Sequence, residues 1–184
     1  MNSPTSAGYR RRRVIRRLGV GGITALAGCL SWPQDGALDD GEGDVREWQG
    51  TTIEDISGAE FRIAEISSPT ILHTFATNCL TCATQQQELS ALWEARADVE
   101  IVELTVDPND TAADLARHAE RGSGEWRVGV APDGFVRSLV EEFGQAVAVS
   151  AQSPIIVVCE DGETDTRQKV ASADILATAI DDTC

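Results

Sequence analysis

The sequence predicts an α/β protein: a three-layer α/β/α sandwich with a mixed central sheet and an N-terminal β-hairpin. Three observations predict it. Short, nearly continuous apolar runs, typical of buried strands, alternate with segments in which apolar residues recur at helical spacing. A tight turn joins the last two strands, which makes them antiparallel and the sheet mixed. The 184 residues, 42% hydrophobic and 24% charged, have room for one domain and an extra segment.

The first 28 residues resemble a signal peptide. The arginine-rich run Arg10–Arg17 precedes a glycine-rich apolar stretch too short to span a bilayer, which takes about 20 residues. Residues 11–16, Arg-Arg-Arg-Val-Ile-Arg, resemble the twin-arginine export signal. Residues 26–29, Leu-Ala-Gly-Cys, resemble the bacterial lipobox, which implies that a lipid on Cys29 anchors the chain outside the cytoplasmic membrane, an oxidising place. The alternative is a basic arm with an incidental cysteine.

Residues 29–50 are polar and acidic and show neither helical nor strand periodicity. We expect a linker there, followed by the folded domain at 51–184. The formal net charge is −15, and from Cys29 onward the chain has nine basic and thirty acidic residues. Such a surface offers phosphates no basic patch, which argues against nucleic acid as a partner. With Lys169 as the only lysine, the composition predicts a halophilic host, the alternative being an acidic protein from an ordinary organism.

The domain opens with the elements that lead to the central motif. Residues 51–66 predict a hairpin, with strands at 52–56 and 60–64 around a turn at Ser57-Gly58. The apolar run Thr70–Ala76 predicts a buried central strand. In residues 84–96, apolar side chains recur at helical spacing, which predicts a helix directly after this strand.

The remaining elements continue the alternation of strands and helices. They are a strand at 99–106, a helix that Thr111 caps and that runs to Arg121, a strand at 126–131, a helix around 135–143, a strand at 154–159, a turn at 160–163, a strand at 164–170 and a helix around 175–180. Each predicted helix places its apolar residues on one face, which suits packing against a sheet.

Cys79 and Cys82 lie between the strand at 70–76 and the helix that follows it. A thiol at a helix N-terminus lies against free N–H groups and the positive end of the helix dipole, which favours the thiolate. We therefore predict a redox-active disulfide. Cys79, nearer the helix start, forms a mixed disulfide with a partner protein, and Cys82 resolves it. The alternative is a disulfide that only staples the helix start, although so short a loop gains little from cross-linking.

Residues 75–82, Phe-Ala-Thr-Asn-Cys-Leu-Thr-Cys, resemble the motif of membrane-tethered, extracytoplasmic thiol–disulfide oxidoreductases of the TlpA type, which have the thioredoxin fold. The resemblance implies exchange with protein thiols and disulfides, a part in cell redox homeostasis, and no cofactor or metal. It also implies that Pro154 corresponds to the proline that is cis in that fold and shapes the partner groove. Asn78 stands where the family usually has tryptophan, and no proline lies between the cysteines.

Residues 106–111, Val-Asp-Pro-Asn-Asp-Thr, resemble the Sco copper chaperones, which share the fold and take part in assembling a respiratory oxidase. This resemblance implies an alternative function, copper delivery, with Cys79, Cys82 and His73 as ligands. The histidine that Sco proteins carry just before the third apolar strand is missing here. His73 is expected in the core or at an edge, and His118 is expected to be solvated on a polar helix.

Two further cysteines follow the central motif. Cys159 ends an apolar strand, so a small buried hydrophobic residue is the default interpretation. A bridge from Cys159 to Cys184 that ties down the C-terminal segment is the alternative. The sequence leaves it open, because a bridge requires Cα atoms within about 4.4–6.8 Å of each other.

Overall fold

The computed structural model describes residues 45–122 and 126–184. The predictions for the signal segment, for Cys29 and for most of the linker lie outside the described residues. In the described part, a five-stranded sheet has the order β5-β4-β3-β6-β7. Its strands are β3 (Thr70–Phe75), β4 (Glu100–Thr105), β5 (Arg127–Val130), β6 (Ile155–Val158) and β7 (Thr164–Arg167). The first three are parallel, and β6 and β7 are antiparallel to their neighbours, so the sheet is mixed as predicted.

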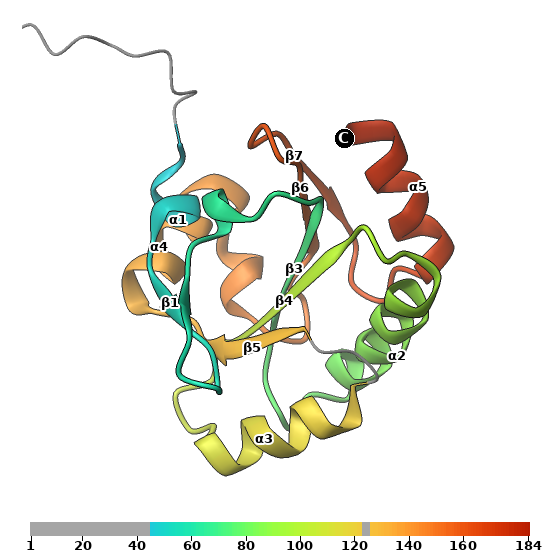
Figure 1. Cartoon of the computed structure of the whole chain (residues 1–184). Helices are drawn as coiled ribbons and strands as arrows, with labels where there is room; N and C mark the ends of the chain where they lie inside the picture. The colour runs from blue at the N-terminus through green and yellow to red at the C-terminus, as the bar shows by residue number, and fades with distance from the viewer. Residues whose placement is uncertain (1–44, 123–125) are drawn as a thin grey trace, which may run out of the picture. The chain divides into compact units, whose positions relative to one another are not determined.

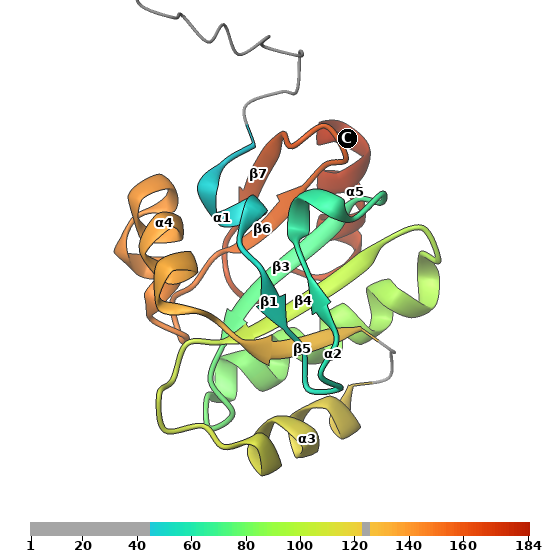
Figure 2. The same cartoon turned by 60° about the vertical axis from the view of Figure 1, so that its left-hand side comes forward.

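Helices cover both faces of this sheet (Figures 1 and 2). They are α2 (Leu80–Ala95) and α5 (Ala173–Thr183) on one face, α4 (Asp133–Phe143) on the other, and α3 (Ala112–Arg121) beside β5. Side chains of β3 alternate between the two cores: Ile71 and Phe75 pack on the α2 side, and Leu72 packs on the α4 side. The three-layer sandwich is therefore confirmed.

The N-terminal hairpin is present but shorter than predicted. It consists of β1 (Ile53–Glu54) and β2 (Glu60–Phe61), which are antiparallel. Residues Ile63–Glu65, predicted as strand, form the 3-10 turn η1. An isolated antiparallel bridge pairs Asp55 with Gly129, so the hairpin covers part of the free edge of β5.

The fold begins earlier than predicted. Residues Glu47–Gly50, assigned to the linker, form the short helix α1. Trp48 is only 1% exposed and lies edge-to-face on Phe135 and Phe143, with ring centroids 6.1 and 5.8 Å away. Its indole N–H donates to Glu142 at 2.6 Å. One large aromatic side chain in a polar stretch carries too little periodicity to reveal this docking.

The start of α3 follows its sequence signal. Thr111 caps α3, because its hydroxyl accepts from the N–H of Asp114 and the Asp114 carboxylate accepts from the N–H of Thr111. The short 3-10 helix η2 (Gln145–Ala148) connects α4 to the loop before β6.

Within the described ranges, no helix combines the length and the apolar character needed to cross a membrane.

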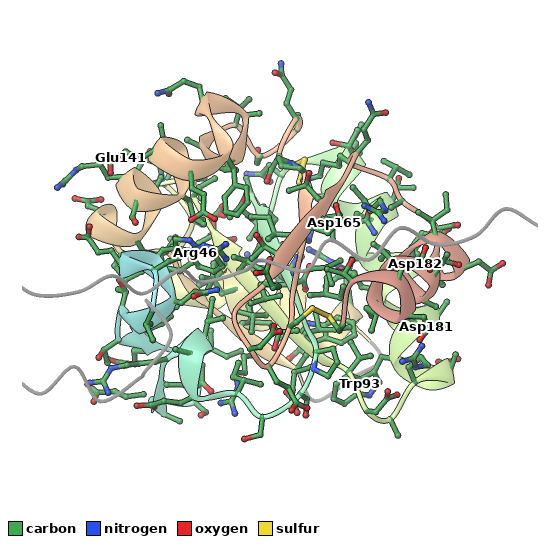
Figure 3. The ribbon with its side chains drawn as sticks, turned by 90° about the horizontal axis from the view of Figure 1, so that it is seen from above. Arg46, Trp93, Glu141, Asp165, Asp181 and Asp182 are labelled. Carbon is green, nitrogen blue, oxygen red and sulfur yellow. A yellow bond between two sulfur atoms is a disulfide. The ribbon has the colours of Figure 1, made fainter. Side chains whose placement is uncertain are left out.

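Cys159 and Cys184 form a disulfide with a Cα–Cα distance of 5.2 Å. The sequence left this bridge open as an alternative, and the structure contains it. The bridge joins the residue after β6 to the residue after α5, and so fastens this helix to the sheet. Figure 3 shows acidic side chains around these elements, with Asp181 and Asp182 exposed on α5 and Glu141 exposed on α4.

Candidate active site

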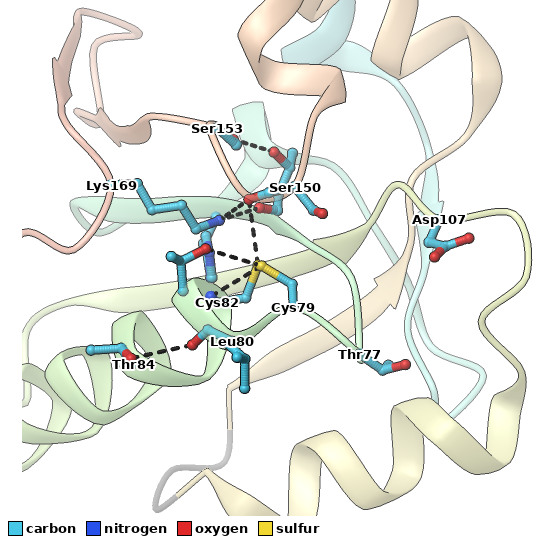
Figure 4. Close-up of a disulfide and its surroundings, with 12 residues drawn as sticks. Thr77, Cys79, Leu80, Cys82, Thr84, Asp107, Ser150, Ser153 and Lys169 are labelled. Carbon is cyan, nitrogen blue, oxygen red and sulfur yellow. Dashed lines mark hydrogen bonds between the residues drawn. A yellow bond between two sulfur atoms is a disulfide. The ribbon is translucent and has the colours of Figure 1, made fainter.

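Cys79 and Cys82 form a disulfide at the start of α2, with a Cα–Cα distance of 5.2 Å (Figure 4). Cys79 is the N-cap residue, and the N–H of Cys82 donates to its sulfur at 3.2 Å. Cys79 is half-buried, whereas Cys82 is only 1% exposed. The sulfur nearer the helix start is therefore the one that a partner can reach, and the other is held in the core.

The segments that surround the disulfide are poor in charged residues and expose several apolar side chains. Leu80, between the cysteines, is 86% exposed, and Val149 and Val170 are also exposed. Three segments meet here, and none contains an acidic residue, although the chain has thirty: 76–86, 146–154 and 168–173. Their only charged residue is Lys169. These three segments contrast with the acidic composition of the whole chain, and acidic side chains reach them only from other segments, as Asp110 reaches Thr77.

Asp110 fixes the loop that delivers Cys79. Its carboxylate accepts from the N–H of Thr77 at 3.0 Å and from the hydroxyls of Thr77 and Thr105. Thr77 lies between β3 and α2, and Asp110 lies in the loop after β4, so one carboxylate joins two segments on neighbouring strands. We infer that this contact holds the loop that leads into the start of α2.

We expect Asp110→Asn to lower the free energy of unfolding by about 1–3 kcal/mol, because an amide NH₂ group then faces a donor that has lost its acceptor. Exchange at Cys79 should slow as well. The measurements are urea unfolding and the rate of thiol exchange. Asp107→Asn is the matched control, since the Asp107 carboxylate, in the same loop, accepts from Asn109 and not from the segment that carries Cys79 (Figure 4 labels Asp107 and Thr77). Equal losses in both variants would contradict the role of Asp110.

The loop before β6 forms the other wall of the site. The hydroxyl of Thr74 donates to the carbonyl of Val147 at 2.8 Å and also contacts Ser153, which ties this loop to β3. As a result, the carbonyl oxygen of Ser150 lies 3.4 Å from Cys82 Sγ. The expected cis bond before Pro154 is absent: no peptide bond in the described residues is cis. Ser150 is the residue of this loop whose carbonyl contacts the cysteine pair, and the role of Pro154 in the partner groove stays a prediction.

A buried polar cluster lies in the sheet beneath the site. Glu103 on β4 is fully buried and accepts from His73 Nδ1 at 2.8 Å, His118 Nε2 at 2.9 Å and Trp126 Nε1 at 3.0 Å. Gln86 of α2 also donates to it, at 3.4 Å. Because an ionised carboxylate only accepts, its neighbours all act as donors.

The titration of this cluster follows from its contacts. Burial raises the pKa of Glu103, but hydrogen bonds from His118 and His73 outweigh it and lower the pKa to about 2. Burial lowers the pKa of His73, and its contact with Glu103 opposes this only in part. The prediction for His73 as a core residue is confirmed. The prediction for His118 was wrong: it is 2% exposed and stacks on Phe75 at 4.0 Å, because α3 turns this face toward the sheet.

The copper ligand set is not brought together. In residues 45–122 and 126–184, no group of three or more His, Cys, Asp and Glu side chains is arranged to hold a metal ion. His73 Nδ1 is engaged by Glu103, and its Nε2 is buried without a partner. Cys79, Cys82 and His73 therefore do not form one cluster.

Three residues of the site were missed by sequence reasoning. Asp110 was seen only as part of the Sco-like stretch, and Ser150 acts through a backbone carbonyl that no side-chain pattern reveals. One feature of the sequence could have drawn attention to Lys169, because it is the only lysine in the chain. Nothing in the sequence showed that it returns to the cysteine pair.

No protein-family model matches the chain, and no curated protein matches it either. Solved structures do match. They include a secreted Mycobacterium tuberculosis disulfide oxidoreductase homologous to E. coli DsbE, at 18% identity and a TM-score of 0.59, covering 74% of this chain and 98% of that one. A thioredoxin-like protein from Aeropyrum pernix has 19% identity and a TM-score of 0.57, covering 74% and 91%.

An SCO1/SenC family lipoprotein from Bacillus anthracis is also similar, with 13% identity and a TM-score of 0.59, covering 71% of this chain and 89% of that one. Similarity at this level of identity concerns the fold. The domain thus has the thioredoxin-like fold, with a Cys-x-x-Cys disulfide at the start of α2.

Proposed function

We propose that this thioredoxin-like domain belongs to a membrane-anchored thiol–disulfide oxidoreductase that exchanges the Cys79–Cys82 disulfide with partner proteins outside the cytoplasmic membrane. The observation that carries the proposal is the asymmetry of the pair: a half-buried sulfur at the N-cap of a 16-residue helix and a buried sulfur one turn later. A disulfide that only stapled the helix start would not need one cysteine accessible at the surface and the other buried.

The exchange has two steps in the reducing direction. The Cys79 thiolate attacks a disulfide of the partner, so that one partner sulfur leaves and takes up a proton from water. Cys82 loses its proton to water and attacks Cys79 Sγ. The Cys79–Cys82 bond forms, and the second partner sulfur leaves and is protonated. Two electrons pass to the partner, and the reverse sequence oxidises it.

The location follows from the N-terminal sequence. A twin-arginine type segment and a lipid on Cys29 would hold the domain outside the membrane, where disulfides persist. Two of the similar structures carry compatible names, one a secreted protein and one a lipoprotein. The two thiols carry the electrons themselves, so the proposed chemistry needs no cofactor.

We expect the full chain with Cys29→Ser to reduce a disulfide substrate such as insulin in the presence of dithiothreitol, and Cys79→Ser to fall to the uncatalysed rate. Cys82→Ser should instead accumulate a mixed disulfide at Cys79, because the resolving thiol is gone. Mass spectrometry of the trapped adduct and the insulin turbidity rate check this, in molar salt. If dithiothreitol does not reduce Cys79–Cys82, the proposal fails.

Copper delivery is the alternative function. It would use Cys79 and Cys82 with a third ligand from His73 or from outside the chain. Among residues 45–122 and 126–184 no contact supports it, since His73 is held by Glu103. Stoichiometric binding of Cu(I) by the reduced protein, lost in Cys79→Ser, would favour this function over thiol–disulfide exchange.

A further inference from the structure

Lys169, the only lysine of the chain, lies next to the cysteine pair (Figure 4). Its Nζ donates to the carbonyl oxygen of Thr74 at 3.2 Å and also to that of Ser150. The Ser150 oxygen is the same atom that lies 3.4 Å from Cys82 Sγ. The ammonium group and the buried sulfur are therefore neighbours that share one carbonyl oxygen.

This ammonium group has no carboxylate partner in the described part of the chain. Lys169 belongs to none of the ion pairs of the described residues. Burial lowers the pKa of Lys169 to about 8, and the charge of Glu103, on the sheet, acts in the opposite direction. A partly buried cation held only by carbonyl oxygens is costly unless an anion comes to it.

The backbone around Lys169 is held in a strained form. Val170 has a φ of 65°, in the left-handed region that β-branched residues rarely adopt. The next residue explains why it persists: the side-chain amide of Gln85, on α2, accepts from the N–H of Ala171 at 2.9 Å and donates to its carbonyl at 3.0 Å. Strain that a neighbouring contact maintains at a reactive site suggests a functional reason for the geometry.

We propose that Lys169 is the electrostatic partner of the Cys82 thiolate and speeds the resolving step of the exchange. The inference rests on the proposed function. Burial of Cys82 in the core disfavours a thiolate there, and a nearby cation favours it. In the oxidised protein the sulfur is neutral and Lys169 lacks a counter-ion, whereas in the reduced protein the thiolate supplies one.

The charge acts in one step only. Cys82 gives its proton to water, and its thiolate attacks Cys79 Sγ in the mixed disulfide. The bond between Cys79 and the partner sulfur breaks, and that sulfur leaves with the electron pair and is protonated by water. At pH 7, below its pKa of about 8, Lys169 keeps its proton throughout. The other titratable groups coupled to Lys169 are Glu103 on β4 and His73 on β3, both inside the sheet.

The reaction with 4,4′-dithiodipyridine, a neutral disulfide, separates the two steps. Reduced protein, as the full chain with Cys29→Ser, releases one thiopyridone when Cys79 attacks and a second when Cys82 closes the ring. We expect Lys169→Met to shift the pH midpoint of the second release upward by about one unit. At pH 7 its rate should fall about threefold, since a more basic thiolate is scarcer but more nucleophilic. The first release should change less than twofold.

Three variants keep the test falsifiable. Lys169→Arg, which retains the charge, should restore the midpoint, and Lys169→Gln replaces Lys169→Met if the latter does not fold. Arg167→Met is the matched control. Arg167 lies two residues before Lys169 and pairs with Asp165, so this variant removes one positive charge that is not held at the cysteine pair. An unchanged second release in Lys169→Met, or an equal change in Arg167→Met, would overturn the role of Lys169 but leave the proposed function standing. Wild-type protein that never gives a second release would overturn the proposed function as well.

Discussion

Replacing Glu103 with leucine should lower the free energy of unfolding by about 3–5 kcal/mol, one of the two largest losses that we expect. The carboxylate is fully buried and serves as acceptor for the rings of His73, His118 and Trp126. An apolar side chain of similar size leaves these donors in the core without an acceptor. Urea unfolding in molar salt measures the loss.

Glu100→Gln is the matched control for this substitution. Glu100 is the first residue of the same strand and is only partly buried, so its amide variant should stay within about 0.5 kcal/mol of wild type. Glu103→Gln, which keeps one acceptor oxygen, should fall between the control and Glu103→Leu. Stability of Glu103→Leu equal to wild type would show that the cluster contributes nothing to the fold.

The pH dependence of this loss has a defined sign. The pKa of Glu103 is about 2 in the folded protein and 4.5 as a reference, so its contribution is complete above pH 4.5 and disappears as the pH falls toward 2. The difference between wild type and Glu103→Gln should therefore narrow below pH 4.5. The pKa of His73 is also lowered from 6.5, so both groups make acid destabilising, in the case of His73 from pH 6.5 downward.

Removing the Cys159–Cys184 bridge should cost about 3.5 kcal/mol. The cross-link spans 25 residues, and closing a loop of that length removes this much conformational freedom from the unfolded chain. The double variant Cys159→Ala/Cys184→Ala should unfold at correspondingly lower urea concentration, with α5 the first helix to lose protection in hydrogen exchange, because the bridge fastens it to β6.

The other disulfide of the same domain provides the control. Cys79 and Cys82 are three residues apart, so the same loop-closure argument gives their bond less than half of that stabilisation. The double variant Cys79→Ala/Cys82→Ala should lose little stability and all exchange activity. A greater loss of stability there than in Cys159→Ala/Cys184→Ala would reverse the roles assigned to the two disulfides.

Much of the architecture could be predicted because periodicity is a local signal. The strand at 70–75 and the helix after the cysteines follow from apolar runs and their spacing, and Thr111 marks a helix start through its own hydroxyl. The pairing of Cys79 with Cys82 follows from their separation. The short helix at Trp48 and the burial of His118 could not be predicted from the sequence, because each depends on packing against elements that are distant along the chain.

The sequence by itself therefore determined the order of the elements and the position of two thiols at a helix start, since both depend on residues close together along the chain. Only the tertiary structure decided that Cys159 reaches Cys184, that Asp110 holds Thr77, and that Lys169 and Ser150 lie against the buried sulfur. The residues in these contacts are 25, 33, 19 and 68 positions apart along the chain. The packing of strands and helices brings such segments together, and no local pattern of residues records that.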